Sequence, residues 1–595
     1  MKKKSPEDGN APKKKATGKK TPAHPDKEET KAGGDDLEVS RGKSPTEGPP
    51  KITGGGIAKL RKPMRTGITK ITIENFKGVA DKVEIPIRPI TLLFGANSAG
   101  KSTILQALLY LRELLEGRSP DTDRMMAGGA SLDLGGFRDF VHGRLRGNRI
   151  RVGVEVRLDD DGLPNVGWDA EDPDDEPIAA ELDGVREVSV DVCVEWSNEN
   201  WKPYITHYQV GLDGEPFAAI RTRPGGESQL DVVNLNHPLV AIDDDGEATL
   251  FDELANAFNL NFAISPILDT RNDDVRGDQR LLLGSNATPD FGRGLPEKWA
   301  YPPLSDEQRV AATRSFNVLN RAMTGAGNVI LSELRKIRYI GPIRRIPERN
   351  FQPVRSPGEN RWADGSGAWD LLLGERMDLE WFEEEPFADL GLGVVPRYQS
   401  YFEVPNRSLL GMIIDRALER GEDDIDKLFP DDISDLDTIV RRSRVQLVRE
   451  DSDLPMMPCD VGIGVSQALP VAIGAMAPGY RILAVEQPEL HIHPAIQCNL
   501  GDLLAKQVIK DEGRTMLLET HSEHLILRML RRIRENTEGT LDDDKPALVP
   551  EHLSVLWVEQ HGGVVAIKPI PVNPQGDFDE EWPKGFFEER FDEYE

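Results

Sequence analysis

Nine consecutive residues, 95–103, have the types and spacing of a loop that binds phosphate groups. They fit the pattern G-x-x-x-x-G-K-[ST] and are Gly95, Ala96, Asn97, Ser98, Ala99, Gly100, Lys101, Ser102 and Thr103. The glycines allow backbone N–H groups to close around phosphate oxygens. The Lys101 ammonium can reach the β- and γ-phosphates, and the Ser102 hydroxyl can take a place on Mg²⁺. The loop therefore predicts a binding site for a nucleoside triphosphate such as ATP.

A second group of candidate residues follows an apolar run late in the chain. Residues 481–485 are Arg-Ile-Leu-Ala-Val, and the strand that they predict leads into Glu486. An acidic residue at such a strand end, beside a phosphate-binding loop, is placed to hold the water shell of Mg²⁺. The next residue, Gln487, can position a water molecule but is a very poor acceptor of its proton. We therefore expect slow hydrolysis, unless Glu489 supplies the base.

Small residues precede an apolar helix shortly before this strand. Residues 460–467 are Asp-Val-Gly-Ile-Gly-Val-Ser-Gln. A serine at a helix start can offer its hydroxyl and the backbone N–H groups around it to a γ-phosphate. Gly464 and Ser466 are therefore candidates for nucleotide binding, and the alternative is that Ser466 is an ordinary helix cap.

The elements that must position these residues are readable in the hydrophobic pattern. The apolar run 90–94 predicts a buried strand before the loop, and apolar residues at helical spacing up to 115 predict a helix after it. This context is what the motif requires, and it disfavours a chance glycine turn. Alternating residues predict further strands at 68–76 and 83–87. Those between about 148 and 219, such as 150–156 and 188–194, would form an antiparallel sheet.

The composition narrows the class of protein. The chain has 595 residues and a formal net charge of −29, so any contact with nucleic acid would have to be a local patch. Its three cysteines lie far apart, without the spacing of a metal site or a disulfide framework, which suits a reducing cytoplasm. We find no signal peptide and no apolar stretch that could span a bilayer. We expect a cytoplasmic protein without a membrane partner.

Together these motifs resemble the OLD-like (overcoming lysogenization defect) branch of AAA/ABC-class ATPases, which have a head of the SMC type. The resemblance depends mainly on Glu-Gln-Pro-Glu-Leu-His-Ile-His-Pro at 486–494 and Glu-Thr-His-Ser-Glu-His at 519–524. The run Trp-Pro-Lys-Gly-Phe-Phe at 582–587 is similar to the tail of a bacterial subgroup. Many relatives carry a Toprim nuclease, but too few residues follow Val565 for one. We expect any nuclease to be a separate chain.

The resemblance implies roles for further residues. His521, after the apolar run 515–519, matches the switch histidine that contacts the γ-phosphate, and a satisfied core histidine is the alternative. Asp139 occupies a position that senses Mg²⁺ and the γ-phosphate, often through a Gln, although an ordinary acidic loop residue is an equal alternative. Ser466 would complete the nucleotide site of the opposite subunit in a homodimer. Gln487 stands where the family usually has the Glu that activates water.

The segment 340–347, Ile-Gly-Pro-Ile-Arg-Arg-Ile-Pro, resembles one in the insertion of OLD-like ATPases. Its two prolines restrict the backbone, and we expect Arg344 and Arg345 to project from it. A contact with phosphate or a partner and a turn with solvated arginines are both open.

The predicted fold class is α/β: an ABC-class ATPase head with a mixed sheet, an α+β insertion domain and a disordered N-terminal tail. The tail is the charged segment 1–56, which cannot bury enough apolar surface to fold. The remaining predicted ranges are lobe one of the ATPase at 57–235, a mixed helical insertion at 236–445 and lobe two at 446–595.

These inferences lead to a functional hypothesis. We expect an ATP-binding protein, and an ATPase, that dimerises around two ATP molecules and controls a partner or nucleic acid. The resemblance implies anti-phage defence or, alternatively, DNA maintenance by an SMC-like ATPase. A further alternative is a non-hydrolysing, nucleotide-gated scaffold for an effector nuclease, which Gln487 favours.

Overall fold

The computed structural model describes most of the chain between Gly67 and Trp582. The described residues are 67–117, 133–159, 162–164, 182–222, 228–234, 237–239, 282–284, 287–295, 306–374, 382, 384–404, 409–420, 440–452 and 454–582. The chain divides into two units, 1–63 and 64–595, and the structure below is that of the second. The predicted tail 1–56 and the residues after Trp582 lie outside the described part.

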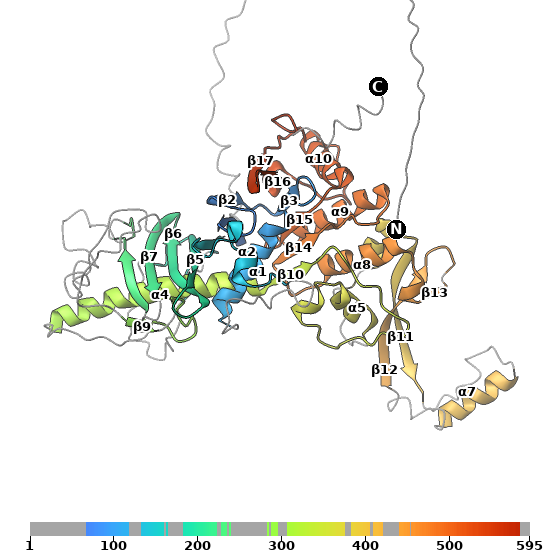
Figure 1. The fold of residues 1–595 in the computed structure, drawn as a ribbon. Helices are drawn as coiled ribbons and strands as arrows, with labels where there is room; N and C mark the ends of the chain where they lie inside the picture. The colour runs from blue at the N-terminus through green and yellow to red at the C-terminus, as the bar shows by residue number, and fades with distance from the viewer. Residues whose placement is uncertain are drawn as a thin grey trace, which may run out of the picture. The chain divides into compact units, whose positions relative to one another are not determined.

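A six-stranded mixed sheet carries the predicted phosphate-binding loop (Figure 1). Its strands are β3 (Ile90–Phe94), β10 (Ile337–Ile340), β14 (Ile482–Glu486), β15 (Thr515–Glu519), β16 (Leu553–His561) and β17 (Val564–Ile570). The strand order is β10-β14-β15-β3-β16-β17, and only β17 is antiparallel to its neighbour. Because the other five strands are parallel, their carboxyl ends meet at one edge of the sheet.

Helices pack on both faces of this sheet. They are α1 (Ser102–Glu116), α4 (Asp306–Arg335), α8 (Ile463–Met476), α9 (Pro494–Lys510) and α10 (Glu523–Glu538). Successive side chains of a strand point to opposite faces. Leu93 accordingly joins the core that contains α1 and α4, whereas Leu92 and Phe94 join the core of α8, α9 and α10. All residues of β3 are buried, which explains its uninterrupted apolar sequence.

An eight-stranded antiparallel sheet forms the second large layer. Its strands are β1 (Gly67–Glu74), β2 (Val83–Pro86), β4 (Ile150–Arg157), β5 (Glu187–Ser197), β6 (Lys202–Leu212), β7 (Glu215–Thr222), β8 (Ser228–Val233) and β9 (Leu282–Gly284). The order is β2-β1-β4-β5-β6-β7-β8-β9. The predicted α/β class with a mixed sheet is therefore confirmed, as is the antiparallel sheet.

The remaining elements come mostly from the range that we predict as an insertion, 236–445. They are α5 (Ser366–Leu373), α6 (Glu385–Leu390), α7 (Leu409–Arg420) and the sheet of β11 (Val394–Glu403), β12 (Val440–Arg449) and β13 (Pro455–Met456), with the short α2 (Phe137–Phe140) elsewhere. Strand β10 also falls in this range, yet it pairs with β14 along its whole length. The domain boundaries stay a prediction.

Candidate nucleotide and metal site

The glycine-rich loop connects β3 to α1. Gly95 has φ +144°, and a Cβ atom there would lie 2.0 Å from the carbonyl oxygen of Val558, so the position requires glycine. Gly100 also has a positive φ, +99°. The first turn of α1 contains no acidic residue, which leaves the positive end of the helix available to an anion. Three loop residues, at 96–98, are exposed, whereas Ala99 and Thr103 are buried.

Lys101 lies inside this loop. Its Nζ atom donates to the carbonyl oxygens of Gly95 at 3.0 Å and Ala96 at 2.9 Å, and it lies 4.0 Å from a carboxylate oxygen of Glu519. The side chain is 3% exposed, and burial lowers the pKa of Lys101. Nearby carboxylates oppose this effect. The ammonium is thus held where the loop would enclose phosphate oxygens.

Two carboxylates converge on the Ser102 hydroxyl. Glu486 ends β14 and Glu519 ends β15, and the two residues are direct partners in the parallel ladder. The Ser102 Oγ atom lies 2.6 Å from an oxygen of Glu519 and 3.3 Å from one of Glu486. A hydroxyl has a single proton and cannot donate fully to both. Burial, and then the charge of Glu486, raises the pKa of Glu519 to about 7, and burial also raises the pKa of Glu486.

This arrangement fits a magnesium ion. Mg²⁺ prefers hard oxygen ligands, and its sites at phosphates use one or two carboxylates, leaving positions for phosphate oxygens and water. Ser102, Glu486 and Glu519 provide such a set, and a divalent cation would relieve the repulsion between the two carboxylates. Among the described residues, no group of three or more His, Cys, Asp and Glu side chains is arranged for a metal. The candidate set is therefore small, with two carboxylates and one hydroxyl.

Glu519 is absent from the sequence-based set of site residues. It has the same local signal as Glu486, an acidic residue at the end of an apolar strand. What the sequence did not indicate is that β15 lies between β3 and β14. The sequence analysis also missed Lys77. Its Nζ atom donates to Gln106 on α1. Burial lowers the pKa of Lys77, and the negative charge of the nearby Glu486 opposes this effect.

The loop after β14 and the loop after β15 are joined by Glu489. Its two carboxylate oxygens accept hydrogen bonds from the Thr520 hydroxyl at 2.8 Å and the His521 backbone N–H at 2.6 Å. Both oxygens are thus engaged in holding the second loop. Burial and the nearby Lys101 lower the pKa of His521, which favours its neutral form. Gln487 adopts φ +48°, and its backbone N–H donates to the Glu519 carbonyl at 2.7 Å.

Ser466 does not start its helix. The N-cap of α8 is Gly462, so Ser466 lies one turn inside, and our prediction of a serine at the helix start is wrong. Its hydroxyl donates to the Ile463 carbonyl at 2.8 Å, and the residue is fully buried. The accessible part of this helix end is Gly462 and Ile463, with Gly464 half-buried. Any contact with a nucleotide would use these residues rather than the Ser466 hydroxyl.

Asp139 caps its own short helix. Its carboxylate accepts the Gly136 backbone N–H at 3.0 Å, and the side chain is exposed. The segment is fixed beside the end of β1, because the Lys77 backbone N–H donates to the Phe140 carbonyl at 2.6 Å. This geometry matches the ordinary structural role that the sequence left open, and a role in sensing Mg²⁺ stays a prediction.

The two arginines after β10 differ. Arg345 is exposed as predicted, but Arg344 is 3% exposed and points inward, so the expectation that both project is wrong for Arg344. Its guanidinium donates to the carbonyls of Glu486 at 2.7 Å and Gln487 at 3.0 Å. Tyr339 of β10 donates its hydroxyl to a Glu486 carboxylate oxygen at 2.7 Å. Sequence patterns alone contain no signal for this Tyr339 contact.

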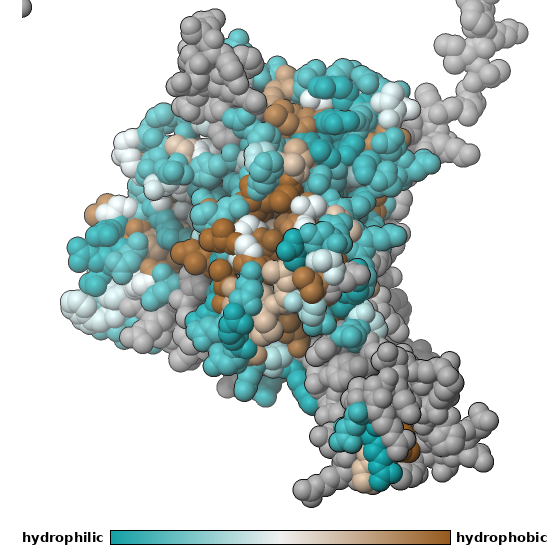
Figure 2. Space-filling view, turned by 90° about the vertical axis from the view of Figure 1, so that its right-hand side faces the viewer, coloured by the Kyte–Doolittle hydropathy of each residue, from teal (hydrophilic) through white to brown (hydrophobic). Residues whose placement is uncertain are grey.

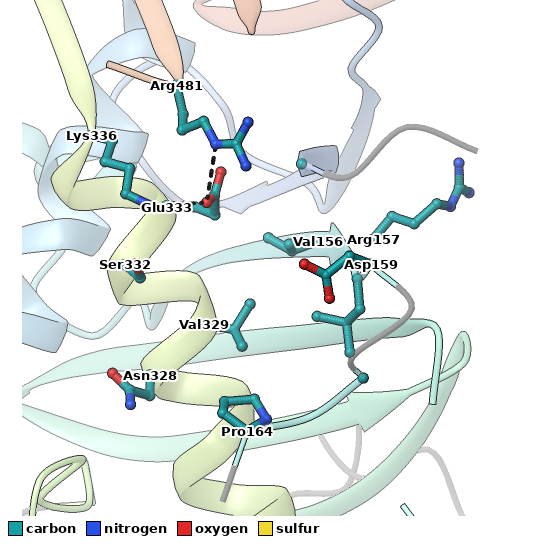
Figure 3. Close-up of a pocket in the computed structure, with 13 residues that line it drawn as sticks. Val156, Arg157, Asp159, Pro164, Asn328, Val329, Ser332, Glu333, Lys336 and Arg481 are labelled. Atoms are coloured by element: carbon teal, nitrogen blue, oxygen red, sulfur yellow. Dashed lines mark ion pairs between the residues drawn. The ribbon is translucent and has the colours of Figure 1, made fainter. Parts of the chain in front are cut away.

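A pocket of about 430 Å³ lies at the edge of the six-stranded sheet where the parallel strands begin (Figure 3). Its lining includes α4, the end of β4 and Arg481, which precedes β14. The Glu333 carboxylate lies 3.8 Å from Arg481 and 3.6 Å from Lys336, while Arg157 points away from it (Figure 3). This pocket contains none of the predicted site residues.

Comparison with known proteins agrees with the local geometry. Residues 67–124 match the family model described as AAA ATPase domain. This match spans a small part of the chain and supports an ATPase of the AAA type. The matched segment includes β1 to α1 with the phosphate-binding loop, and such a domain implies nucleotide binding. No curated protein sequence matches the chain.

Solved structures similar to this chain include heads of SMC proteins. One is an Smc head bound to the C-terminal winged-helix domain of ScpA, with 12% identity, a TM-score of 0.30 and coverage of 85% of this chain and 97% of that one. An Smc head from Pyrococcus furiosus bound to the C-terminal domain of ScpA has 11% identity, a TM-score of 0.32 and coverages of 85% and 96%. The SMC head from Thermotoga maritima has 9% identity, a TM-score of 0.32 and coverages of 85% and 99%. Likeness at this level carries no information about partners.

Proposed function

We propose that this protein binds Mg²⁺·ATP and hydrolyses it slowly. The observation that carries the proposal is the convergence of Glu486 and Glu519 on the Ser102 hydroxyl, next to the Lys101 ammonium. Lys101 and the backbone N–H groups of the loop would bind the β- and γ-phosphates. Ser102, Glu486 and Glu519 would hold Mg²⁺, which would supply electrostatic stabilisation of the charge that develops on the phosphoryl oxygens.

The slow rate follows from the residues around the attacking water. Gln487 follows the metal-facing carboxylate and can orient water without accepting its proton. Glu489, the alternative base, already accepts two hydrogen bonds from Thr520 and His521. We assign Glu489 to positioning the loop that presents His521 to the γ-phosphate. The chain would then rely on electrostatic stabilisation more than on general-base catalysis.

We propose that two copies dimerise around two ATP molecules, with the N-terminal end of α8 facing the partner's nucleotide. A helix N-terminus attracts phosphate, and its exposed residues here include Gly462 and Ile463. Ile463 is 53% exposed, and Met457 and Ile343 on neighbouring segments are 43% and 82% exposed. Figure 2, which views the molecule from the side of α8 and β13, contains a hydrophobic area among hydrophilic residues. Exposed apolar patches often mark interfaces.

The nucleotide state would control a partner protein or nucleic acid, as in anti-phage defence or DNA maintenance. The net charge of −29 favours a protein partner, such as an effector nuclease, over extensive contact with nucleic acid. No helix in the described part of the chain combines the length and hydrophobicity of a membrane span.

The second candidate function is a nucleotide-gated scaffold that binds ATP without turnover. Gln487 is the observation that favours it, because a carboxylate is missing at the position next to Glu486.

Steady-state phosphate release by the purified protein separates the two functions, with Lys101→Ala as the control. We expect wild-type release clearly above that of Lys101→Ala. Release at the level of this variant, alone and with added DNA, would refute hydrolysis and leave the scaffold.

Light scattering with and without Mg²⁺·ATP tests dimerisation. We expect an ATP-dependent dimer that Ile463→Glu abolishes. Ile509→Glu, which changes an exposed isoleucine in the last turn of α9, is the matched control and should still dimerise. A wild-type monomer under both conditions would refute the proposed dimer.

A further inference from the structure

The carboxylate of Glu486 is held from a strand that lies outside the nucleotide-binding motifs. β10 is the edge strand of the sheet and pairs with β14, with Tyr339 opposite Ala484 and Ile340 opposite Val485. Tyr339 donates its hydroxyl to Oε1 of Glu486 at 2.7 Å. The other oxygen of the same carboxylate, Oε2, is the one that faces Ser102. The hydroxyl of Tyr339 thus selects which oxygen is presented to the metal position.

The main chain beside this carboxylate is held by the loop after β10. Arg344 donates to the carbonyls of Glu486 and Gln487, at 2.7 and 3.0 Å, and to that of Gln467 at 3.4 Å. Gln467 in turn donates from Nε2 to the Arg344 carbonyl at 2.9 Å. The guanidinium therefore connects the end of β14 to the first turns of α8. Burial lowers the pKa of Arg344 to about 10, so it stays charged at neutral pH.

The loop itself is fixed on both sides of these contacts. The Gly341 backbone N–H donates to the Ala363 carbonyl at 2.8 Å, and the Arg345 N–H donates to the Asp364 carbonyl at 2.7 Å. A Cβ atom on Gly341 would lie 2.9 Å from the Ala363 oxygen, which leaves little room for a side chain. Rigid support of this kind is what metal ligands need, because outer hydrogen bonds orient them.

We propose that Tyr339 and Arg344 are positioning residues for the magnesium site: Tyr339 sets the Glu486 carboxylate, and Arg344 sets the backbone of Glu486 and Gln487. The inference rests on the proposed binding of Mg²⁺·ATP. It adds a functional role to β10 and its loop, which bind no nucleotide themselves. A buried tyrosine that only filled space would serve equally well as phenylalanine, and the two possibilities differ in a measurable way.

The test is the affinity for a fluorescent ATP analogue, mant-ATP, measured with Mg²⁺ and again with EDTA. The ratio of the two affinities reports the contribution of the metal. In Tyr339→Phe this ratio should fall about tenfold, because outer hydrogen bonds to metal ligands typically contribute 10- to 100-fold in affinity. The affinity in EDTA should stay as in the wild type. A general loss of structure would lower both affinities together.

Matched controls exist in the same chain. Tyr208→Phe removes another buried hydroxyl, which donates to the Met323 carbonyl at 2.8 Å, and should leave the ratio unchanged. Arg344→Lys should lower the ratio, whereas Arg338→Lys should not. Arg338 is likewise buried and donates to three carbonyls, but at the opposite end of α8.

The outcomes separate this inference from the proposed function. A wild type whose affinity for mant-ATP is the same with Mg²⁺ and EDTA would refute the magnesium site and this inference with it. A wild type that gains affinity with Mg²⁺, while Tyr339→Phe and Arg344→Lys gain just as much, would overturn this inference alone. If Tyr339→Phe does not fold, the Arg344→Lys and Arg338→Lys pair decides the question.

Discussion

The six-stranded sheet has one edge where its parallel strands begin and one where they end, and the charged side chains at these two edges are compensated to different degrees. At the edge where the parallel strands begin, Lys336 precedes β10 and Arg481 precedes β14, and both lie near Glu333. Opposite charges lie close together there, and the two basic side chains are partly exposed to water. At the edge where the strands end, Glu486 and Glu519 face the same hydroxyl with little exposure to water. Charge that is buried and only partly compensated is costly, which supports the proposal that this second edge binds a cation and a phosphate.

The largest effect should come from placing a carboxylate, as a general base, next to Glu486 at the edge where the parallel strands end. Gln487→Glu should raise ATP turnover by at least about 100-fold, the lower end of what a general base contributes. Gln487→Asn, which keeps an amide, is the control and should not raise it. Phosphate release is the measurement, and an unchanged rate in Gln487→Glu would show that water activation does not limit turnover.

Removing a lysine should weaken nucleotide binding at the edge where the strands end and have no effect on it at the edge where they begin. Lys101→Ala should weaken mant-ATP binding about 100-fold, since hydrogen bonds to charged groups contribute up to about 3 kcal/mol. Lys336→Ala, at the other edge, should leave the affinity unchanged. Equal losses of affinity in the two variants would show that Lys101 has no specific role in binding the nucleotide.

The buried carboxylates should make the nucleotide-free protein sensitive to pH. The pKa of Glu519 is about 7 in the folded protein, above its ordinary value of 4.5, mainly because of burial. The folded state therefore binds more protons than the unfolded state between these values, and its stability falls as pH rises from about 4.5 to 7. Glu519→Gln removes this penalty and should stabilise the protein at pH 8 by on the order of 2 kcal/mol.

Thermal midpoints of wild type and Glu519→Gln at pH 5 and pH 8 check this expectation. The thermal midpoint of Glu519→Gln, relative to that of the wild type, should increase as pH rises. A difference between the two proteins that does not change with pH would count against the protonation of Glu519.

The smallest effect on stability is expected at the edge where the parallel strands begin. Glu333→Gln should change stability by no more than about 1 kcal/mol, because its two ion pairs are long, 3.6 and 3.8 Å, and the basic partners are partly exposed to water. The thermal midpoint of this variant is the measurement. A loss as large as that expected for a buried pair would show that this edge is not simply solvated.

Some of the site could be predicted from local sequence, and some depended on the topology. The strand, loop and helix around Lys101 follow from a continuous apolar run and helical spacing, and Glu486 follows from its place at a strand end. Glu519 becomes a neighbour of Ser102 only because β15 inserts between β3 and β14. Local patterns do not specify that order, and so they could not select Glu519 over other acidic residues.

Helix starts and side-chain directions were harder to predict. The serine in 460–467 suggested a helix cap, but residues 463–465 already adopt helical geometry and Gly462 takes the cap position. The Ser466 hydroxyl then bonds back to the preceding turn, a common alternative for serine inside a helix. Arg344 points inward because carbonyls at the end of β14 need donors. That requirement exists only in the folded arrangement.

The most direct test of the central claim is the magnesium dependence of ATP-analogue binding in Glu486→Gln and Glu519→Gln. The affinity for mant-ATP is measured for both variants and the wild type, once with Mg²⁺ and once with EDTA. The account predicts that Mg²⁺ strengthens binding to the wild type, that each variant loses at least about tenfold of this gain, and that binding in EDTA does not weaken. An equal gain from Mg²⁺ in the wild type and both variants would contradict the assignment of these two carboxylates to the metal site.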